Sequence, residues 1–308
     1  AKQLFQRPQS PYTKGLINAV PPVDQRPKRL QTVQDFIKGS NKPTNETIAE
    51  RKKRHKHLYQ QPPILEVKGL EKTFTQAKQS HRALHEINFS LYPGETLGLV
   101  GNSGSGKSTL GNCLLKLTQP DSGEIYYSGT KIDALKGEAL KKYRKDVQLI
   151  FQNPFSSLNP KQKIEEILTE PMLVHNIGAR KAERIDRAVE LLEQVGLEAD
   201  HLNAYPHIFS GGQRQRVGIA RALAVEPKLI VCDESVSALD RSVQAQVLNL
   251  LNELKETYGF TYLFIAHDLE VVRYMSDRIL HLQNGKIITL DEADAVYQQI
   301  QDHKTPVK

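Results

Sequence analysis

Short apolar runs along the chain alternate with longer segments that have the apolar period of an amphipathic helix. Residues 96–100, 228–233 and 261–266 form the apolar runs, and their lengths are typical of buried parallel strands. Helical periodicity occupies neighbouring segments, at residues 107–117, 212–225 and 242–257. Strands that alternate with helices predict an α/β fold in which a mostly parallel sheet is covered on both faces.

Other segments add two features to this core. Three further stretches are predicted strands, at residues 64–67, 87–91 and 123–128, of which 87–91 alternates with polar residues, and we expect an antiparallel β subdomain beside the main sheet. Residues 147–151 predict one more strand of the main sheet. Residues 161–200 combine many charges with helical periodicity, so we expect a helical insertion over about 153–210.

Composition narrows the class of protein. Hydrophobic residues make up 39% of the 308 residues, and no apolar run approaches the ~18 residues of a membrane span. Cys113 and Cys232 both lie in apolar contexts, which excludes a disulfide framework, a zinc site and an iron–sulfur cluster built from this chain alone. We expect a soluble protein or subunit in a cytosolic compartment. The chain begins with Ala and lacks a signal-peptide pattern, so we expect a fragment of a longer polypeptide.

The net charge of +7 is concentrated at the start of the chain. Residues 1–62 hold 13 of the 42 Lys and Arg but 4 of the 35 Asp and Glu, so the rest of the chain is slightly acidic. The densest basic stretch is Arg-Lys-Lys-Arg-His-Lys-His at residues 51–57. It predicts a solvated linker, with contact to anionic lipid headgroups as the alternative. Aromatic residues are not interleaved with it, so we expect no nucleic-acid partner.

A glycine-rich loop follows the first apolar run. Its sequence fits G-x-x-x-x-G-K-[ST], in which successive backbone amides bind nucleotide phosphates. Lys107 would bind the β and γ phosphate oxygens, and the Ser108 hydroxyl would bind Mg²⁺. A Gly-rich turn with a purely structural role is the alternative. The predicted cofactor-binding residues of this loop are Gly101, Asn102, Ser103, Gly104, Ser105, Gly106, Lys107, Ser108 and Thr109.

Two carboxylates end the apolar run at residues 228–233. Open α/β sheets bind ligands at the carboxyl ends of their parallel strands. We therefore expect Asp233 to hold Mg²⁺ through water and Glu234 to polarise an attacking water. A pair of solvated carboxylates is the alternative, but the phosphate loop upstream favours the catalytic interpretation.

Four further residues have both a structural and a functional interpretation. Gln152 ends a predicted strand, where it could contact metal and water or simply occupy a turn. His267 ends another, where it could contact a γ-phosphate or be structural. Asp240 is by default a turn or N-cap residue for the helix that follows it. Phe74 is either a core residue or stacks on adenine.

Residues 209–216, Phe-Ser-Gly-Gly-Gln-Arg-Gln-Arg, open another predicted helix. Ser210 offers a hydroxyl, and the adjacent Gly211 and Gly212 let the backbone pass close to a ligand. The helix directs its positive, amide-rich end at the same place. We expect this segment, with Gln213, to bind phosphate.

These motifs resemble those of an ABC nucleotide-binding domain over roughly residues 64–290. The phosphate loop, the Q-loop at Gln152, the signature at 209–216, the Walker B pair, the D-loop and the switch His267 occur in the family's order. The resemblance implies an ABC-type P-loop NTPase fold, ATP and Mg²⁺ as cofactors, and ATP hydrolysis. It implies that Glu234, His267 and Gln152 are catalytic and that the signature and Asp240 serve ATP between two domains. The implied metal ligands are Ser108, Gln152 and Asp233.

Finer details resemble ATPases of the oligopeptide, dipeptide and nickel importer group, at residues 94–101, 152–160 and 242–249. Residues 10–21 resemble the tail that ends such ATPases. We therefore expect the second half of a tandem ATPase, divided into a preceding domain's tail plus basic linker, an ABC domain and a C-terminal tail, at residues 1–62, 63–290 and 291–308. Ser235 stands where the family usually has proline, which leaves the loop after Glu234 freer.

The resemblance implies a motor subunit that powers import of peptides or related small solutes through a membrane permease. The implied partners are a second ABC domain, integral-membrane permease subunits, and a periplasmic or extracellular solute-binding protein. The implied location is peripheral, on the cytoplasmic face of the inner (plasma) membrane. A soluble ABC ATPase of a multienzyme complex, such as a carbon–phosphorus lyase accessory ATPase, has the same motifs and stays open as the alternative.

Overall fold

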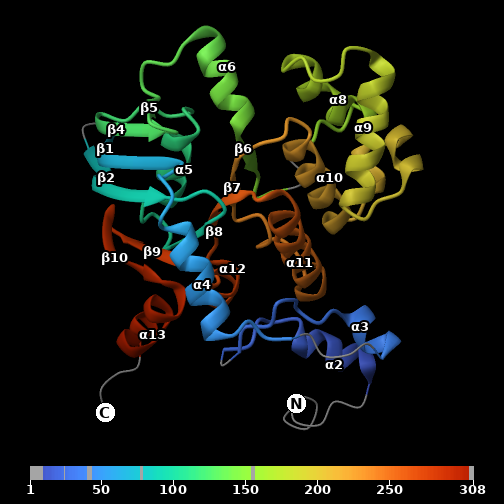
Figure 1. The fold of residues 1–308 in the computed structure, drawn as a ribbon, viewed down its shortest axis with the longest axis horizontal. Helices are drawn as coiled ribbons and strands as arrows, with labels where there is room; N and C mark the ends of the chain where they lie inside the picture. The colour runs from blue at the N-terminus through green and yellow to red at the C-terminus, as the bar shows by residue number, and fades with distance from the viewer. Residues whose placement is uncertain (1–9, 24, 40–43, 77–78, 154–156, 305–308) are drawn as a thin grey trace.

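The computed structural model describes residues 10–304 except residue 24 and residues 40–43, 77–78 and 154–156. The strands are β1 (Leu65–Gln76), β2 (Gln79–Leu91), β3 (Thr96–Val100), β4 (Ser122–Tyr127), β5 (Thr130–Lys131), β6 (Val147–Ile150), β7 (Leu229–Asp233), β8 (Thr261–Ile265), β9 (Arg278–Gln283) and β10 (Lys286–Glu292). They form a six-stranded sheet of order β10-β9-β3-β8-β7-β6 and a four-stranded sheet of order β2-β1-β4-β5. The two sheets lie side by side (Figure 1).

The six-stranded sheet is mostly parallel, as predicted. Strands β9, β3, β8, β7 and β6 pair in parallel, and only β10 is antiparallel. Every residue of β3 and β8 is buried, which explains why these strands are apolar without alternation. Because the central strands are parallel, their carboxyl ends share one edge of the sheet, where ligands bind in this type of fold.

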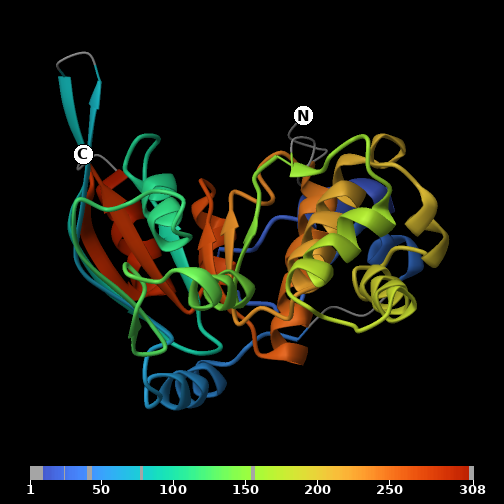
Figure 2. The same cartoon turned by 90° about the horizontal axis from the view of Figure 1, so that it is seen from above.

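The helices are α2 (Pro11–Asn18), α3 (Val33–Lys38), α4 (Ile48–Leu58), α5 (Lys107–Leu114), α6 (Gly137–Asp146), α8 (Ile164–Val174), α9 (Lys181–Gln194), α10 (Gly211–Leu223), α11 (Arg241–Tyr258), α12 (Leu269–Met275) and α13 (Ala293–Lys304). Helices α8, α9 and α10 lie together, away from the four-stranded sheet (Figures 1 and 2). The described part of the predicted insertion is therefore helical. None of the described helices combines the length and apolar character that crossing a bilayer requires.

Each face of the six-stranded sheet has its own hydrophobic core. Ile230 and Cys232 of β7 belong to a cluster that includes residues of α8 to α12. Leu229 and Val231 belong to a second cluster, with α5 and the antiparallel sheet. Successive strand residues point to opposite faces, so the continuous apolar run of β7 supplies both clusters.

The basic stretch that was predicted as a solvated linker lies in helix α4, and the prediction was wrong for its buried residues, Arg51 and His55. The helix opens with a capping box between Thr47 and Glu50, and it buries Arg51, His55 and Leu58. Positions i, i+4 and i+7 lie on one face of a helix, so the buried residues form a single contact surface. A run of charged residues predicts a solvated segment when it is considered by itself. Here Arg51 pairs with Asp294 and Arg54 with Asp277, and both partners lie far along the chain.

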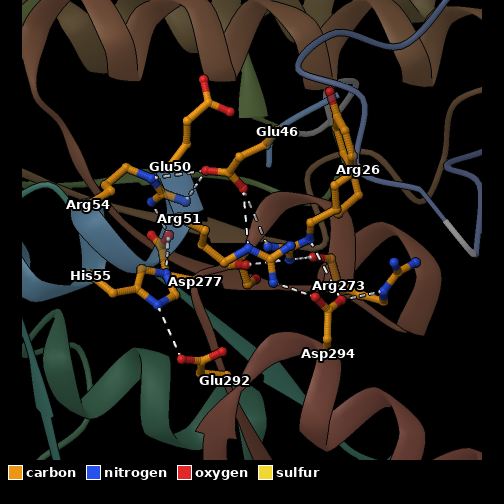
Figure 3. Close-up of polar contacts among 12 residues, drawn as sticks. Arg26, Glu46, Glu50, Arg51, Arg54, His55, Arg273, Asp277, Glu292 and Asp294 are labelled. Carbon is orange, nitrogen blue, oxygen red and sulfur yellow. Dashed lines mark hydrogen bonds and ion pairs between the residues drawn. The ribbon is translucent and has the colours of Figure 1, made fainter. Parts of the chain in front are cut away.

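The buried face of α4 contacts Asp277, at the amino end of β9 (Figure 3). Asp277 is 2% exposed and pairs with Arg54, with His55 Nε2 at 3.2 Å and with Lys255 Nζ at 3.0 Å. The backbone N–H of Thr96 also donates to it, at 2.8 Å. Burial alone would raise the pKa of Asp277, but Lys255, His55 and Arg54 outweigh it and hold that pKa well below its usual range.

The rest of the described leading segment also packs on the body, and we call residues 10–58 the leading strap. Leu30 is 1% exposed, and its backbone N–H and carbonyl bond to the Asn249 side chain at 2.8 and 2.9 Å. Arg26 donates to the Ser276 carbonyl at 2.8 Å. The strap is therefore part of the folded unit in this structure. Its origin in a preceding ATPase domain stays a prediction.

The predicted C-terminal tail is also mostly helical. Ala293 and Val296 of α13 are fully buried in the larger core. Asp294 contacts Arg51 of the strap, and Arg273 Nε of α12 at 2.7 Å. Helix α13 is thereby joined both to α12 and to the leading strap (Figure 3).

Candidate nucleotide site

The predicted phosphate loop lies where the fold requires it, between the carboxyl end of β3 and the start of α5. Gly104 and Gly106 have φ values of +77° and +107°, which favour glycine. The Lys107 Nζ donates to the Gly101 and Asn102 carbonyls at 2.8 and 3.1 Å. Burial lowers the pKa of Lys107, while Glu234 and Asp233 oppose that shift.

A cavity of about 380 Å³ opens beside the loop. Its lining combines the loop, the Q-loop glutamine, the Walker B glutamate, the switch histidine and the aromatic residue predicted as a possible adenine contact. Residues from β1, β2, the phosphate loop and the segments that follow β6, β7 and β8 therefore meet at this edge of the sheet. The lining residues are Phe74, His81, Ala83, Ser103, Gly104, Gly106, Lys107, Ser108, Thr109, Gln152, Glu234 and His267.

Glu234 is the polar centre of this cavity. It is 7% exposed, its φ is +48°, and its backbone N–H donates to the Ile265 carbonyl at 2.8 Å. One carboxylate oxygen accepts a hydrogen bond from Gln152 Nε2, and the other pairs with His267 Nε2. Gln152 and His267 thus each contact Glu234, the third residue predicted as catalytic. A carboxylate fixed at both oxygens has a defined orientation for binding a water or a proton.

Asp233 lies one residue before Glu234, at the end of β7, and does not line the cavity among the described residues. Burial raises its pKa, and Glu234 adds to that shift, whereas Lys107 and His267 oppose it. Its predicted contact with Mg²⁺ through water stays a prediction. Ser235 is 2% exposed, so the residue that replaces the family's proline is buried.

Phe74 is not a core residue. It is 44% exposed on β1, at the mouth of the same cavity, and Lys72 Nζ lies 5.4 Å from its ring centroid. An exposed ring beside a phosphate loop is available for stacking. Contact with adenine remains a prediction for this residue.

His81 and Ala83 line the cavity but were not predicted. Both lie on β2, whose approach to the loop is a tertiary contact between the two sheets. A Cβ on Gly106 would lie 2.4 Å from the Ala83 carbonyl oxygen, so this contact explains the glycine. The sequence of β2 contains no local pattern that would predict this contact with the phosphate loop.

Gly106→Ala is expected to destabilise the fold by about 2 kcal/mol or more, because it adds both a strained φ and a backbone clash. Urea unfolding and ATP affinity measure the effect. Gly129→Ala is the matched control, since Gly129 also has a positive φ of +75° but no atom within 4 Å of its added Cβ. Equal losses in the two variants would show that the Ala83 contact is unimportant.

The signature segment lies outside this cavity. Ser210 caps α10 and forms a capping box with Gln213. A Cβ on Gly212 would lie 2.3 Å from Val243 Cγ1, so this glycine also permits close packing of α10 on α11. Asp240 caps α11 by accepting the N–H of Ser242 and of Val243, each at 3.1 Å. The lining of the cavity within the described chain includes none of Ser210, Gly211, Gly212, Gln213 and Asp240.

The fold and the cavity together define a P-loop nucleotide-binding domain. The family described as ABC transporter matches residues 84–237, and the chain is 48% identical over 236 residues to the oligopeptide transport ATP-binding protein OppF of Bacillus subtilis, covering 76% of this chain and 77% of that relative. The chain belongs to the ABC transporter family. It is therefore an ATP-binding and ATP-hydrolysing domain, as the resemblance implied.

Similarity to curated proteins extends the assignment. The chain is 51% identical over 235 residues to the oligopeptide transport ATP-binding protein OppF of Streptococcus mutans, covering 76% of each chain. It is 41% identical to the glutathione import ATP-binding protein GsiA of Pectobacterium atrosepticum, over 97% of this chain and 48% of that relative. Similarity to importer ATPases, predicted from residues 94–101 and other stretches, is confirmed.

A solved structure supports the fold. A dimeric ATP-binding cassette in a post-hydrolysis state, bound to ADP and Pi, superposes with a TM-score of 0.68 at 34% identity. The match covers 74% of this chain and 98% of that cassette. The predicted fold class is confirmed.

Proposed function

We propose that this chain is the ATP-hydrolysing motor of an importer for peptides or related small solutes. The observation that carries the ATPase part is the meeting of Lys107, Gln152, Glu234 and His267 at one cavity. The substrate class follows from relatives described as oligopeptide, dipeptide and glutathione transport or import ATP-binding proteins. The cytoplasmic face of the inner membrane is the corresponding location.

The residues present fit ATP with Mg²⁺. Open space at the Gly104 Cβ position leaves the loop backbone accessible, and Lys107 and Ser108 line the cavity beside it. Mg²⁺ bound to phosphates needs few protein ligands, and Ser108, Gln152 and Asp233 would supply them. Phe74 would stack on adenine. Glu234 would orient or activate the attacking water, and His267 would hold the γ-phosphate.

The signature needs a partner. In one chain its residues are not among those that line the cavity, and Ser210 and the first turn of α10 would instead complete the site of a second ABC domain. Integral-membrane permease subunits and a periplasmic or extracellular solute-binding protein complete the proposed assembly. No nucleic-acid partner is proposed, because many basic residues of the strap pair with carboxylates within the protein: Arg26, Lys28, Arg29, Arg51 and Arg54.

Reconstitution tests the proposal. The chain is combined with candidate permeases in lipid vesicles, and ATP hydrolysis is measured with and without a peptide mixture and the matching solute-binding protein. Hydrolysis stimulated by peptide supports import. Equal hydrolysis in the presence and absence of any permease, together with co-purification with a soluble enzyme, would favour the carbon–phosphorus lyase type of ATPase instead.

Lys107→Ala is expected to weaken ATP binding by about tenfold or more, because it removes a desolvated cation from the phosphates. Titration with a fluorescent ATP analogue measures the change. Lys181→Ala serves as control, since the Lys181 side chain is 75% exposed on α9. Unchanged affinity in Lys107→Ala would contradict the assignment of the cavity.

A further inference from the structure

The leading strap bonds to the helix that follows the switch histidine. Helix α12 begins two residues after His267, and Asp268 between them is its N-cap. At the other end of this helix, Arg26 Nη2 donates to the Ser276 carbonyl at 2.8 Å and also to the Arg273 carbonyl. Figure 3 shows Arg26 beside Arg273. One helix therefore connects Arg26 to a residue that lines the nucleotide cavity.

The carboxyl end of α12 needs the donors that Arg26 supplies. The last carbonyls of a helix have no partner within the helix, and Ser276 is only 2% exposed, so water has little access. Arg26 is itself 8% exposed. Burial lowers its pKa to about 10, with Asp294 opposing that shift, so the guanidinium stays charged at neutral pH. A positive charge is favourable at this end of a helix, because the helix dipole is negative there.

The backbone around Arg26 is fixed to the rest of the protein. The Arg26 carbonyl accepts the backbone N–H of Glu46 at 2.8 Å. Four residues later, Leu30 forms two backbone hydrogen bonds with the Asn249 side chain, which lies on α11. Asn249 is 4% exposed, and α11 contributes several residues to the larger core. Arg26 therefore extends from a rigid segment, and it can fix the position of the helix that it binds.

The position of His267 depends on α12 more than on packing of its own side chain. That side chain is 50% exposed, and it pairs with Glu234 through Nε2. Helix α12 has seven residues, so its ends are about 10 Å apart. Val272 packs on Gly98 of β3, where an added Cβ would lie 2.3 Å from Val272 Cγ1, and this contact sets how closely the helix approaches the sheet. The hydrogen bonds of Arg26 act at the end of the helix and set its position along its axis.

We infer that Arg26 is a positioning residue for the switch histidine. By holding the carboxyl end of α12, it keeps His267 in contact with Glu234 at the cavity. The leading strap is then required for ATP turnover, although none of its described residues lines the cavity. The inference rests on the proposed function, because His267 affects turnover only if ATP is hydrolysed at this cavity.

The effect on His267 can be observed without turnover. In the full chain with isotope-labelled histidine, the imidazole NMR signals of His267 are assigned by their loss in His267→Ala. Arg26→Met is expected to shift these signals, because it removes the donors that hold α12 and keeps an unbranched side chain in their place. Lys28→Met is the matched control, since the Lys28 side chain is 48% exposed and pairs with Glu50 within the strap.

Turnover in the reconstituted assembly separates positioning from binding and from a general loss of structure. Arg26→Met is expected to lower kcat about tenfold while the affinity for a fluorescent ATP analogue changes less than about twofold. Both hydrogen bonds come from one nitrogen, which a lysine ammonium can replace, so Arg26→Lys is expected to keep kcat within about threefold of the parent. In a His267→Ala background, Arg26→Met is expected to lower kcat by less than about a further twofold, because the residue through which Arg26 acts is gone.

Two outcomes would overturn the inference and leave the proposed function intact. His267 signals and kcat equal to those of Lys28→Met would show that α12 does not need Arg26. A full tenfold loss in the His267→Ala background would show that Arg26 acts by another route. If urea unfolding shows that Arg26→Met is not folded, Arg26→Gln enters the same comparisons and is judged by the same outcomes. A parent chain that binds no ATP would overturn the proposed function as well.

Discussion

Replacing Glu234 by glutamine is expected to lower ATP turnover by about 10²–10⁴-fold, the range that a positioned general base contributes. Glutamine keeps the size of the side chain but removes its capacity to accept a proton. In the structure this residue is 7% exposed and its carboxylate contacts both Gln152 and His267, and no other carboxylate of the described residues lines the cavity. Phosphate release by the reconstituted assembly measures kcat.

The affinity for ATP is expected to change little in Glu234→Gln, because Lys107 and the loop amides are untouched. Glu190→Gln is a suitable control, since that side chain is 59% exposed on α9 and is not part of the cavity lining. Turnover equal to that of the control would contradict the catalytic role of Glu234. Lost ATP affinity would instead show that the glutamate holds the loop together.

Much of this site was predictable because each of its motifs is a short, continuous stretch of sequence next to a predicted strand. The phosphate loop needs a strand before it and a helix after it, and both are visible as an apolar run and a helical period around Lys107. Parallel strands bring their carboxyl ends to one edge, so Gln152, Glu234 and His267 meet although they are far apart in sequence. The contacts of Gln152 and His267 with Glu234 follow from the neighbouring order of β6, β7 and β8.

The leading strap was not predictable from the same rules. The partners of Arg54 and Arg51, Asp277 and Asp294, lie 223 and 243 residues later, and no local pattern joins them. A weaker signal was present at the start of α4, where Thr-x-x-Glu at residues 47–50 forms the capping box that often begins a helix. His81 and Ala83 were missed for a similar reason, since two sheets must first pack together to bring them to the loop.

Asp277→Asn is expected to destabilise the protein by about 3–5 kcal/mol at neutral pH, the cost of breaking a buried ion pair. The substitution keeps the shape of the side chain but leaves Lys255 and Arg54 without their shared negative charge. Asp294→Asn is expected to cost less, because the Asp294 side chain is 41% exposed and its pairs are screened by water. Urea unfolding of each full chain measures the difference, with the exposed Asp186→Asn as control.

The stability that Asp277 contributes is expected to fall at acidic pH. The pKa of Asp277 is held well below the ordinary aspartate value of 3.8 by Lys255, His55 and Arg54, so the folded state favours the ionised carboxylate. Its contribution is fully present above the unfolded pKa and is lost as pH falls through the lower folded pKa. The difference in free energy of unfolding between the parent chain and Asp277→Asn should therefore stay constant from pH 7 to about 5 and become smaller below about pH 4. A gap that narrows as pH rises instead, or a variant as stable as Asp186→Asn, would show that the strap does not depend on this carboxylate.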